Sequence, residues 1–374
     1  MTHNNPQEAG EMNVDFRSLG TLPTALPGIS ILYVGDLIWC GTCLQRCRAL
    51  EELRNHVEPL DIYRGQPLAR QLRILPRAMR KIGFPLDLAR VNQEIISAVK
   101  RQPFDVLWLD KGLLVRPSTL QNVRSLQPNC KIVGYSPDDM SGNRNNQSRY
   151  FLRHLPLYDV FFTTKSYGVE ELRDLDCPRV VFVGNAFDAN THRPHALTPE
   201  EKAKYGGPVG FIGAWEAERE NSMLALARAG LKVRVWGSGW KNARGSHPNL
   251  VLEHRDLLGE EYAKGICAFD INLCFLRKVN RDLQTTRSVE IPACGAFMAA
   301  ERTAEHLALF EEGKEAVFFS SDDELIEKVR YFLDHPEERL QVAAAGRRRC
   351  LSDGYSNHER MKAMLREIPI ESPR

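Results

Sequence analysis

The sequence predicts an α/β protein built from two doubly wound parallel-sheet domains that face each other across a cleft. Its 374 residues exceed what one hydrophobic core usually supports. Short apolar runs alternate with longer amphipathic stretches, which is typical of repeated β-α units. This alternation breaks once near the middle of the chain and then restarts. The apolar runs are nearly continuous, which indicates strands covered on both faces.

The N-terminal domain is expected over residues 28–190. The segment before it, residues 1–27, is polar and rich in Gly, Pro, Asn and Thr, so we expect a poorly ordered leader. It has no basic region followed by an apolar core and is not expected to be a signal peptide. The amphipathic period predicts helices over 88–102 and 166–175. Runs of β-branched and aromatic residues predict strands at 28–35, 105–110, 131–136, 159–164 and 179–184.

The second domain is expected over residues 208–350. Asn, Pro, His and a Gly-Gly pair interrupt the β-α rhythm before it, so residues 191–207 are predicted to form the linker. A helix is predicted over 216–230, and a C-terminal helix is predicted within 351–374. The predicted strands of this domain are 207–213, 231–237, 268–275, 294–300 and 315–321.

Composition separates the function classes only weakly. The 50 basic residues nearly balance the 48 acidic ones, and no strongly basic stripe is present, so nucleic-acid binding is not expected. No apolar run reaches the roughly 18 residues that a membrane-spanning helix needs. We therefore expect a soluble, cytoplasmic protein, and a peripheral contact with a membrane surface stays open. The nine scattered cysteines fit thiols kept reduced in a cytoplasm.

One group of cysteines needs a closer look. Cys40, Cys43 and Cys47 have a spacing that could hold an iron-sulfur cluster. The segment that follows has a helical pattern, which would place Cys43 and Cys47 on one helix face. We therefore favour packing of these thiols inside a helix interface, and no metal site is predicted.

The most informative segment runs from residue 277 to 301. It follows a predicted strand, continues with a helical period and stops at Gly295, a residue suited to ending a helix. A helix that starts at a strand end presents unpaired N–H groups to an anion such as a diphosphate. Asp282, Thr286 and Glu290 are four apart and are predicted to share one helix face, with Arg287 beside them. An ordinary surface helix with spaced charges is the competing interpretation.

These residue types would divide the work of holding a nucleotide. Arg287 offers paired donors to a phosphate, and Glu290 can accept hydrogen bonds from two ribose hydroxyls. Lys278 is placed to assist with the diphosphate.

The same region resembles a known family. The run TTRSVEIPACGAF at 285–297, followed by AERT and by EEGKEAVFFSS, is similar to the C-terminal region of GT-B glycosyltransferases. The closest subgroup is the CgeB-like one among the glycosyl transferases group 1 family, and the resemblance extends from about residue 205 to 360. It implies two Rossmann-like domains, dependence on a nucleotide sugar, no metal requirement, and a C-terminal helix that crosses back to the first domain.

The resemblance also implies roles for two acidic residues. In the retaining members of this group, two acidic residues separated by seven others frame the donor, and Asp282 and Glu290 have that spacing. Glu290 matches the residue that binds the ribose. Asp282 stands where the family usually has Glu, at the position that contacts the sugar.

Two further loops of the second domain are candidates for donor binding. Gly213 ends a strand and allows close approach of a ligand, and Arg219 lies in the first turns of the next helix. Members of the family carry an Arg there, near the diphosphate. The competing interpretation is an ion pair of Arg219 with Glu216 or Glu220 on its own helix. Gly237, in the run WGSGW, could line a nucleobase pocket or form a plain turn.

The N-terminal domain supplies weaker candidates. Gly35 ends the first strand, and Gly41 and Thr42 precede a helix, so this loop could approach the donor phosphates. It lacks the full dinucleotide-binding fingerprint. Asp138 and Asp139 follow a strand and could orient or deprotonate an acceptor hydroxyl, although such polar loops are commonly only turns.

Four further residues of the N-terminal domain and the linker need an interpretation. Asp110 and Lys111 form another candidate acceptor contact. His154 and His192 show no ligand-like spacing and are expected to be structural.

The expected activity is metal-independent transfer of a sugar from a nucleotide-diphosphate sugar, with retention of configuration, to the hydroxyl of a saccharide, a glycan or another acceptor. No cofactor is expected besides the donor substrate. A sugar-nucleotide epimerase of similar plan and a non-catalytic small-molecule-binding module are the alternatives, since this architecture hosts several functions. The sugar, the acceptor and the oligomeric state are not predicted.

Overall fold

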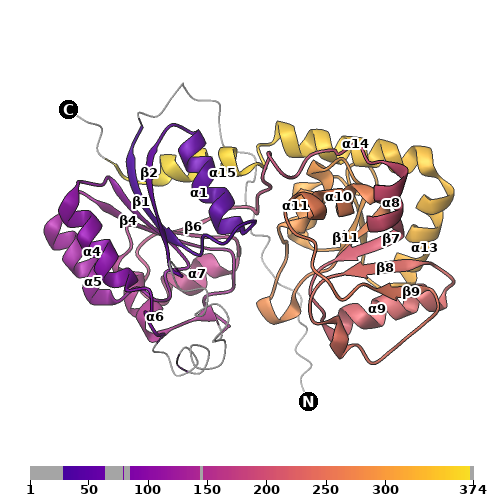
Figure 1. The fold of residues 1–374 in the computed structure, drawn as a ribbon, viewed down its shortest axis with the longest axis horizontal. Coiled ribbons are helices and arrows are strands. Elements are labelled where there is room, and N and C mark those ends of the chain that lie inside the picture. Colours follow the sequence, from indigo (N-terminus) through magenta and orange to yellow (C-terminus); the bar gives the residue numbers. More distant parts are fainter. Residues whose placement is uncertain (1–27, 64–78, 80–84, 144–145, 371–374) are drawn as a thin grey trace, which may run out of the picture.

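The computed structural model describes residues 28–63, 79, 85–143 and 146–370. The leader predicted over residues 1–27 lies outside the described residues. Two six-stranded sheets form the protein, and every pair of neighbouring strands within them is parallel. Helices are interleaved between the strands, and the two sheets form separate lobes (Figure 1). The predicted pair of doubly wound parallel domains is therefore confirmed.

The N-terminal sheet has the strand order β2-β1-β3-β4-β5-β6. Five of these strands lie where the sequence predicted them, and β2 was missed. β2 is an edge strand with mostly half-buried or exposed residues, and it contains Pro59, which an edge strand tolerates. The bounds are β1 (Ser30–Gly35), β2 (His56–Asp61), β3 (Val106–Asp110), β4 (Lys131–Ser136), β5 (Val160–Thr163) and β6 (Val180–Phe182).

Helices cover both faces of this sheet and enclose two hydrophobic cores. One core lies under α4 and α5, and the other lies under α1. The last helix of the chain, α15 (Asn357–Glu367), contributes Met361, Met364 and Leu365 to the core under α1, and Figure 1 shows it beside α1. The other helices are α1 (Thr42–Glu52), α4 (Val91–Arg101), α5 (Pro117–Leu126), α6 (Arg149–His154), η2 (Leu155–Leu157) and α7 (Gly168–Arg173).

The C-terminal sheet has the order β12-β11-β10-β7-β8-β9. Its one missed strand, β9, is again at an edge and has only three residues. The strands are β7 (Gly207–Ile212), β8 (Val233–Trp236), β9 (Leu250–Leu252), β10 (Phe269–Cys274), β11 (Met298–Glu301) and β12 (Val317–Phe319). The helices are α9 (Ala217–Arg228), η3 (Trp240–Asn242), α10 (Glu260–Ala268), η4 (Lys278–Asn280), α11 (Arg287–Ala293), α12 (Ala304–Leu309), α13 (Asp322–Asp334) and α14 (Pro336–Ser352).

The predicted linker contains one short helix, α8 (Pro199–Tyr205), which begins with a capping box at Thr198 and packs against α10. We propose domain boundaries at 28–190 and 208–350, followed by a final segment at 351–374. No helix in the described ranges is both long and apolar enough to cross a membrane.

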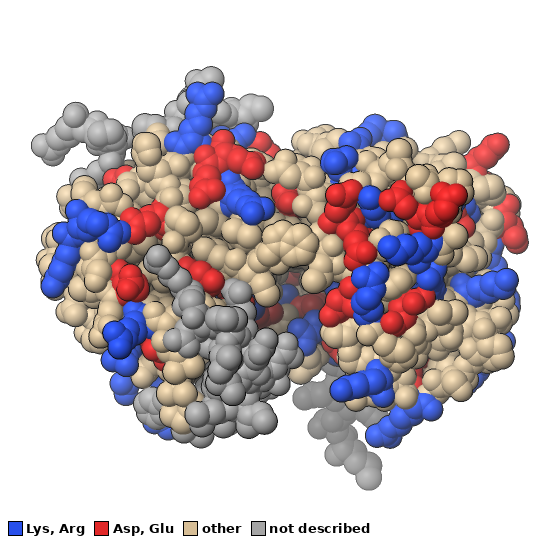
Figure 2. All heavy atoms as spheres, in the orientation of Figure 1, with Lys and Arg blue, Asp and Glu red and all other residues tan. Residues whose placement is uncertain are grey.

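The strand order fixes where a ligand would bind. In each sheet the chain moves outward from a central strand and then returns to its other side, between β1 and β3 in the first sheet and between β7 and β10 in the second. Ligands of such sheets bind at this switch point, beyond the carboxyl ends of the strands. Figure 2 shows a hollow between the two lobes, with acidic and basic side chains mixed over both of them.

Candidate functional site

Three arginines gather at the switch point of the C-terminal sheet. The guanidinium groups of Arg219 and Arg287 lie over the ring of Phe211, 5.4 and 5.9 Å from its centroid. Arg277 follows β10, and its Nε lies 3.1 Å from Oε1 of Glu216. The same oxygen lies 3.5 Å from Nη2 of Arg219. One carboxylate is thus shared by two guanidinium groups, and a third lies close by.

Arg219 is the least satisfied of the three. Its residue is only 2% exposed, and Nη1 donates to the carbonyl of Ala214 at 2.8 Å. Within the described part of the chain, its Nε and Nη2 have no hydrogen-bond partner. Burial lowers the pKa of Arg219, Glu216 raises it, and Arg287 and Arg277 lower it further. A buried cation with unused donors is an unfavourable arrangement unless an anion completes it.

One of the two ion pairs considered for Arg219, the one with Glu216, is present in the structure. Its ion pair with Glu216 exists at 3.5 Å, but without hydrogen-bond geometry. Glu220 is engaged elsewhere, because it accepts hydrogen bonds from the indole of Trp215 and from the backbone of Arg244. The ion pair on the helix therefore does not use the donors of Arg219.

The two candidate glycines bring their loops together beside these arginines. A Cβ on Gly213 would lie 2.6 Å from the Phe211 ring and 3.2 Å from Nη2 of Arg287. Gly237 has a φ of 143°, and a Cβ there would lie 2.0 Å from the carbonyl oxygen of Gly213. Gly237 requires glycine because its loop packs against the backbone of Gly213, and Gly213 requires it because the Phe211 ring fills the space of a side chain.

Helix α11 begins later than the sequence pattern suggested. It starts at Arg287, so the prediction that Asp282, Thr286 and Glu290 share one helix face is wrong for Asp282. Arg281 has a left-handed φ of 47°, which turns the chain before the helix can form, and Asp282 is held by the other domain. Nε of Arg287 donates to the carbonyl of Ile212 at 2.5 Å and ties the start of α11 to the end of β7.

Glu290 is buried and faces two polar side chains. Its Oε2 accepts a hydrogen bond from the hydroxyl of Tyr262 at 2.6 Å, and its Oε1 lies 3.8 Å from Nε2 of His192. Nδ1 of His192 accepts from the backbone N–H of Asp188 at 3.0 Å, so the neutral ring carries its proton on the nitrogen that faces Glu290. Neither Tyr262 nor His192 stands in a motif, so sequence reasoning did not place them beside Glu290.

Lys278 and Thr286 are the remaining candidates for donor binding, and both lie in the segment that leads from β10 into α11. Lys278 is more than half exposed and forms an ion pair with Glu301. Thr286 is half-buried and immediately precedes α11, where its carbonyl accepts the backbone N–H of Glu290 at 2.9 Å.

At the switch point of the N-terminal sheet, the charges are paired. Asp110, at the end of β3, is 5% exposed, and its Oδ2 accepts from the hydroxyl of Tyr33 and from Nε of Arg46, both at 2.8 Å. The Arg46 guanidinium lies over the ring of Tyr135, 4.3 Å from its centroid. Lys111, next to Asp110, points elsewhere and pairs with Asp138. Asp110 is therefore a structural anchor for α1 in this structure.

The predicted phosphate loop of this domain packs inward at its first residue. A Cβ on Gly35 would lie 2.3 Å from Sγ of Cys43, so Gly35 is needed for the contact between β1 and α1. Gly41 is the N-cap of α1, which starts at Thr42. In the described part of the chain, no hydrogen bond joins Gly35, Gly41 or Thr42 to the arginines of the other domain.

The three cysteines at positions 40, 43 and 47 differ in burial. Cys43 and Cys47 lie buried in the core under α1, whereas Cys40 is half-buried in the preceding loop. A Cβ on Gly259 would lie 2.7 Å from Sγ of Cys40, so this loop touches the C-terminal domain. Among the described residues, no group of three or more His, Cys, Asp and Glu side chains is arranged to hold a metal ion.

Asp138 and Asp139 are adjacent but have different surroundings. Asp138 is partly exposed and pairs with Lys111. Burial raises the pKa of Asp138, but the opposing effects of Lys111 and other nearby cations are larger in sum, so its pKa lies below the ordinary value. Asp139 is almost fully buried and is bound by Nε of Arg281 at 2.7 Å and by the N–H of Gly142 at 2.8 Å. Burial raises the pKa of Asp139 as well, and Arg281 brings it below the ordinary value.

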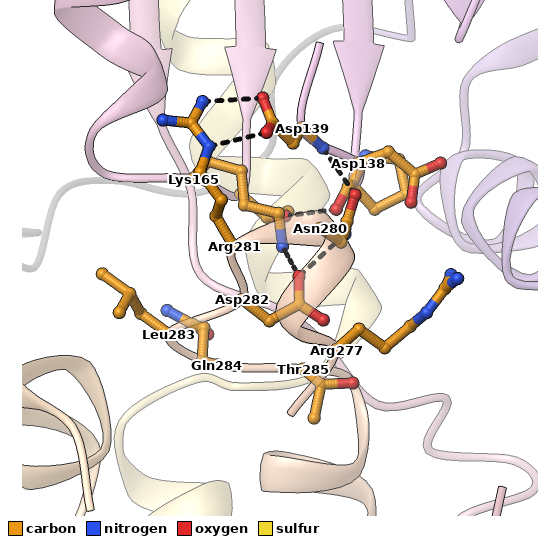
Figure 3. Close-up of polar contacts among 12 residues, drawn as sticks. Asp138, Asp139, Lys165, Arg277, Asn280, Arg281, Asp282, Leu283, Gln284 and Thr285 are labelled. Carbon is orange, nitrogen blue, oxygen red and sulfur yellow. Dashed lines mark hydrogen bonds and ion pairs between the residues drawn. The ribbon is translucent and has the colours of Figure 1, made fainter. Parts of the chain in front are cut away.

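A dense polar contact joins the two domains beside these carboxylates (Figure 3). Nζ of Lys165, just beyond β5, donates to Oδ1 of Asp282 at 2.5 Å. Asn280 donates to the same oxygen at 2.7 Å and accepts from the backbone N–H of Asp139 at 3.0 Å. Sequence reasoning missed Lys165, and its one signal was a lysine directly after the apolar strand at 159–164.

A second polar contact lies next to the first. Glu305 is buried and accepts hydrogen bonds from the hydroxyl of Ser166 at 2.6 Å and from Nε2 of Gln284 at 2.7 Å. The side-chain oxygen of Gln284 in turn accepts from the backbone N–H of Asn185 at 3.0 Å. Gln284, before α11, and Glu305, at the start of α12, thus form hydrogen bonds with residues that follow β5 and β6 of the N-terminal sheet.

Comparisons with known proteins agree with this arrangement. Residues 219–366 match the family model described as glycosyl transferase-like. Sucrose-phosphate synthase from Thermosynechococcus elongatus superimposes with a TM-score of 0.64 at 12% identity, covering 90% of this chain and 98% of that one. A glycosyltransferase from Rickettsia africae superimposes with a TM-score of 0.63 at 11% identity, covering 93% and 100%.

A third structure was solved with a ligand. HepE from Anabaena, in complex with UDP-glucose, superimposes with a TM-score of 0.57 at 13% identity, covering 91% of this chain and 100% of that one. A comparison with curated protein sequences gives no match. The two parallel sheets thus form the GT-B fold found in these structures.

Proposed function

On the premise that residues 219–366 form a glycosyl transferase-like domain within a GT-B fold, we propose that this protein transfers a sugar from a nucleotide-diphosphate sugar to an acceptor hydroxyl. The observation that carries the proposal is the buried guanidinium of Arg219 at the switch point of the sheet. Its Nε and Nη2 have no hydrogen-bond partner among the described residues, and its ion pair with Glu216 is 3.5 Å long. A diphosphate supplies the anionic acceptors that these donors lack.

The arginines would act on the leaving group. As the bond to the sugar breaks, negative charge develops on the diphosphate, and fixed donors in a buried site stabilise that charge. Arg219 and Arg287 are close enough to share the Phe211 ring, and Arg277 adds a third positive charge. Lys278 would join them after exchanging its partner Glu301 for a phosphate oxygen.

The nucleoside would lie against α11. We assign Glu290 to the ribose hydroxyls: Tyr262 occupies its Oε2, whereas Oε1 lies 3.8 Å from His192, beyond hydrogen-bond distance, and is the oxygen that would accept from the ligand. The backbone at Thr286 lies at the start of the helix, where N–H groups favour an anion. Gly213 and Gly237 let their two loops pack together beside the arginines, and we assign these loops to the wall of the donor site. Because HepE was crystallised with UDP-glucose, UDP-sugars are the first donors to test.

The acceptor would enter from the N-terminal domain. Asp138 is the better candidate of the two adjacent carboxylates, because Arg281 and Gly142 already occupy Asp139. Its lowered pKa makes it a weak base, so we assign it to orienting the acceptor hydroxyl. Retention of configuration and independence of metal ions are part of the proposal, and the arginines would neutralise the diphosphate in place of a divalent cation.

Titration calorimetry with UDP and UDP-glucose tests the proposal. Arg219→Ala should weaken both ligands by roughly 10-fold to 100-fold, since a hydrogen bond to a charged group contributes about 1.5–3 kcal/mol. Arg228→Ala, an exposed arginine on the same helix, is the matched control and should leave both affinities unchanged. Equal affinities in wild type and Arg219→Ala would contradict the assignment.

Turnover distinguishes the proposed activity from its alternative. Transfer should require an acceptor and should persist in the presence of EDTA. A changed sugar stereocentre in the UDP-sugar without any acceptor would instead identify an epimerase. NMR of the donor after incubation with and without a saccharide panel reports both outcomes.

A further inference from the structure

A buried ion pair crosses between the domains within the candidate site. The side chains of Lys165 and Asp282 are only 4% and 5% exposed, and their charged atoms lie 2.5 Å apart. Lys165 comes from the N-terminal domain and Asp282 from the segment before α11, so the pair exists only when the two domains are together (Figure 3). It joins the half of the molecule proposed to hold the donor to the half proposed to hold the acceptor.

A gain in stability does not account for a buried ion pair of this kind. Removing two charges from water costs several kcal/mol per ion, and an apolar pair of similar size often stabilises a protein at least as well. The loss is offset only when the charges are well hydrogen-bonded. Here Asn280 supplies a second donor at 2.7 Å, but it binds the same oxygen, Oδ1, that Lys165 binds.

The other carboxylate oxygen is left over. Among the described residues, no hydrogen bond reaches Oδ2 of Asp282, and this atom is not sealed from solvent. The two donors on Oδ1 hold the carboxylate in one orientation. A carboxylate with one fixed and one open oxygen is an acceptor for a hydroxyl group.

We propose that Lys165 is a positioning residue for the donor sugar: it holds Asp282 so that Oδ2 accepts a hydrogen bond from a sugar hydroxyl. The inference rests on the proposed function and adds a division of labour to it. The nucleotide is held by the C-terminal domain alone, through Arg219, Arg287 and Glu290. The sugar is recognised only by the closed pair of domains, because Asp282 needs Lys165 to be in place.

A purely structural role predicts a different pattern. If Lys165 only held the domains together, its loss and the loss of the neighbouring bond from Ser166 to Glu305 would both weaken UDP-glucose. If it acts through Asp282 on the sugar, its loss would weaken UDP-glucose and loss of the Ser166 bond would not. Comparison of the two variants therefore separates the roles.

The experiment measures UDP and UDP-glucose affinities by calorimetry for the full chain and its variants. Lys165→Met keeps the length of the side chain and removes its charge, and Asp282→Asn keeps the shape of the partner and removes its charge. Each should lower the affinity for UDP-glucose at least tenfold and that for UDP less than twofold. Lys165→Arg, which keeps the charge, should restore most of the UDP-glucose affinity.

Ser166→Ala is the matched control. It removes the neighbouring bond across the domains, 2.6 Å long to Glu305, without touching Asp282. It should change neither affinity by more than twofold. If Lys165→Met does not fold, as judged by its melting curve, Asp282→Asn carries the test, since its side chain differs least from the native one.

The outcomes separate the inference from the proposed function. Equal losses for both ligands, or no loss for either, would overturn the role of Lys165 while leaving a UDP-binding protein. Wild-type protein that binds neither UDP nor UDP-glucose would overturn the proposed donor class, and the inference with it.

Discussion

The switch points of the two sheets occupy equivalent places but treat charge differently. In the N-terminal sheet, Asp110 is satisfied by Tyr33 and Arg46, so its burial completes a structural contact with α1. In the C-terminal sheet, Arg219 is equally buried but keeps unused donors. The switch point thus holds a fully paired charge in one domain and a buried arginine with unused donors in the other.

The largest effect should come from breaking the anchor. Arg46→Met would leave the Asp110 carboxylate buried without its cation, which typically costs about 3–5 kcal/mol of unfolding free energy. Denaturant unfolding followed by fluorescence measures the change. Arg48→Met, an exposed neighbour on the same helix, should have little effect. A wild-type unfolding free energy for Arg46→Met would show that the N-terminal pair is not an anchor.

The histidine of the N-terminal core should set the acid sensitivity of this domain. Burial lowers the pKa of His154 to about 4, and its ring nitrogens have no hydrogen-bond partner among the described residues. The unfolded chain therefore binds the extra proton first, below about pH 6.5. Stability should fall by about 3 kcal/mol as the pH drops from 6.5 to 4, since each pKa unit corresponds to about 1.4 kcal/mol.

His154→Leu isolates that contribution. The variant should unfold at a denaturant concentration that depends less on pH over this window. His335→Gln, at an exposed position, should keep the wild-type dependence. Identical pH dependence in His154→Leu and wild type would assign the acid sensitivity to other groups.

Arg219→Met should give the opposite result to Arg46→Met. It removes donors that lack partners, so the unfolding free energy should stay the same or rise by about 1 kcal/mol. UDP affinity should nevertheless fall roughly 10-fold to 100-fold. Melting curves with and without UDP measure both effects in one sample. Strong destabilisation of the ligand-free variant would place Arg219 among the anchors and erase the contrast.

Asp138→Asn should affect turnover and spare donor binding. We expect roughly a tenfold to hundredfold loss in the transfer rate, at the lower end of acid-base effects because Asp138 orients and does not abstract. The lowered pKa of Asp138 keeps it ionised as the pH falls from 8 to 5, so wild-type transfer should not decline there on its account. An acid limb near pH 6 that disappears in Asp138→Asn would refute this.

Lys278→Ala should have the smallest effect. Lys278 is exposed and already paired, and such pairs contribute about 0–1 kcal/mol. UDP affinity should fall at most about fivefold in calorimetry. A larger loss would move Lys278 into the main anion site.

The strands that sequence reasoning found and those that it missed differ in burial. Apolar runs covered on both faces, such as β3 and β5, are visible because nearly every residue is hydrophobic. β2 and β9 lie at sheet edges, where most residues are half-buried or exposed and the run is polar or short. Edge strands depend on their neighbour for structure, and a local pattern does not contain that neighbour.

The site shows the same limit. Arg219 stood out because it follows a strand that ends in a glycine. Arg287 and Glu290 stood out through their helical spacing and through the resemblance of their segment to GT-B glycosyltransferases. Asp282 was placed on a helix face by its spacing alone, and a contact from the other domain decided its position instead. Lys165, Tyr262 and His192 reach the site from distant segments, so only the folded chain brings them there.

The path of the last helix means that the N-terminal domain is discontinuous in sequence. α15 leaves the C-terminal sheet and fills the core under α1 with Met361 and Leu365. An exchange of N-terminal domains between related proteins would therefore have to carry two pieces, the first half of the chain and residues 357–367. A chimaera that exchanged only the first piece would pack its own α1 against a foreign partner. The chain thus crosses between the domains twice, once in the linker and once before α15.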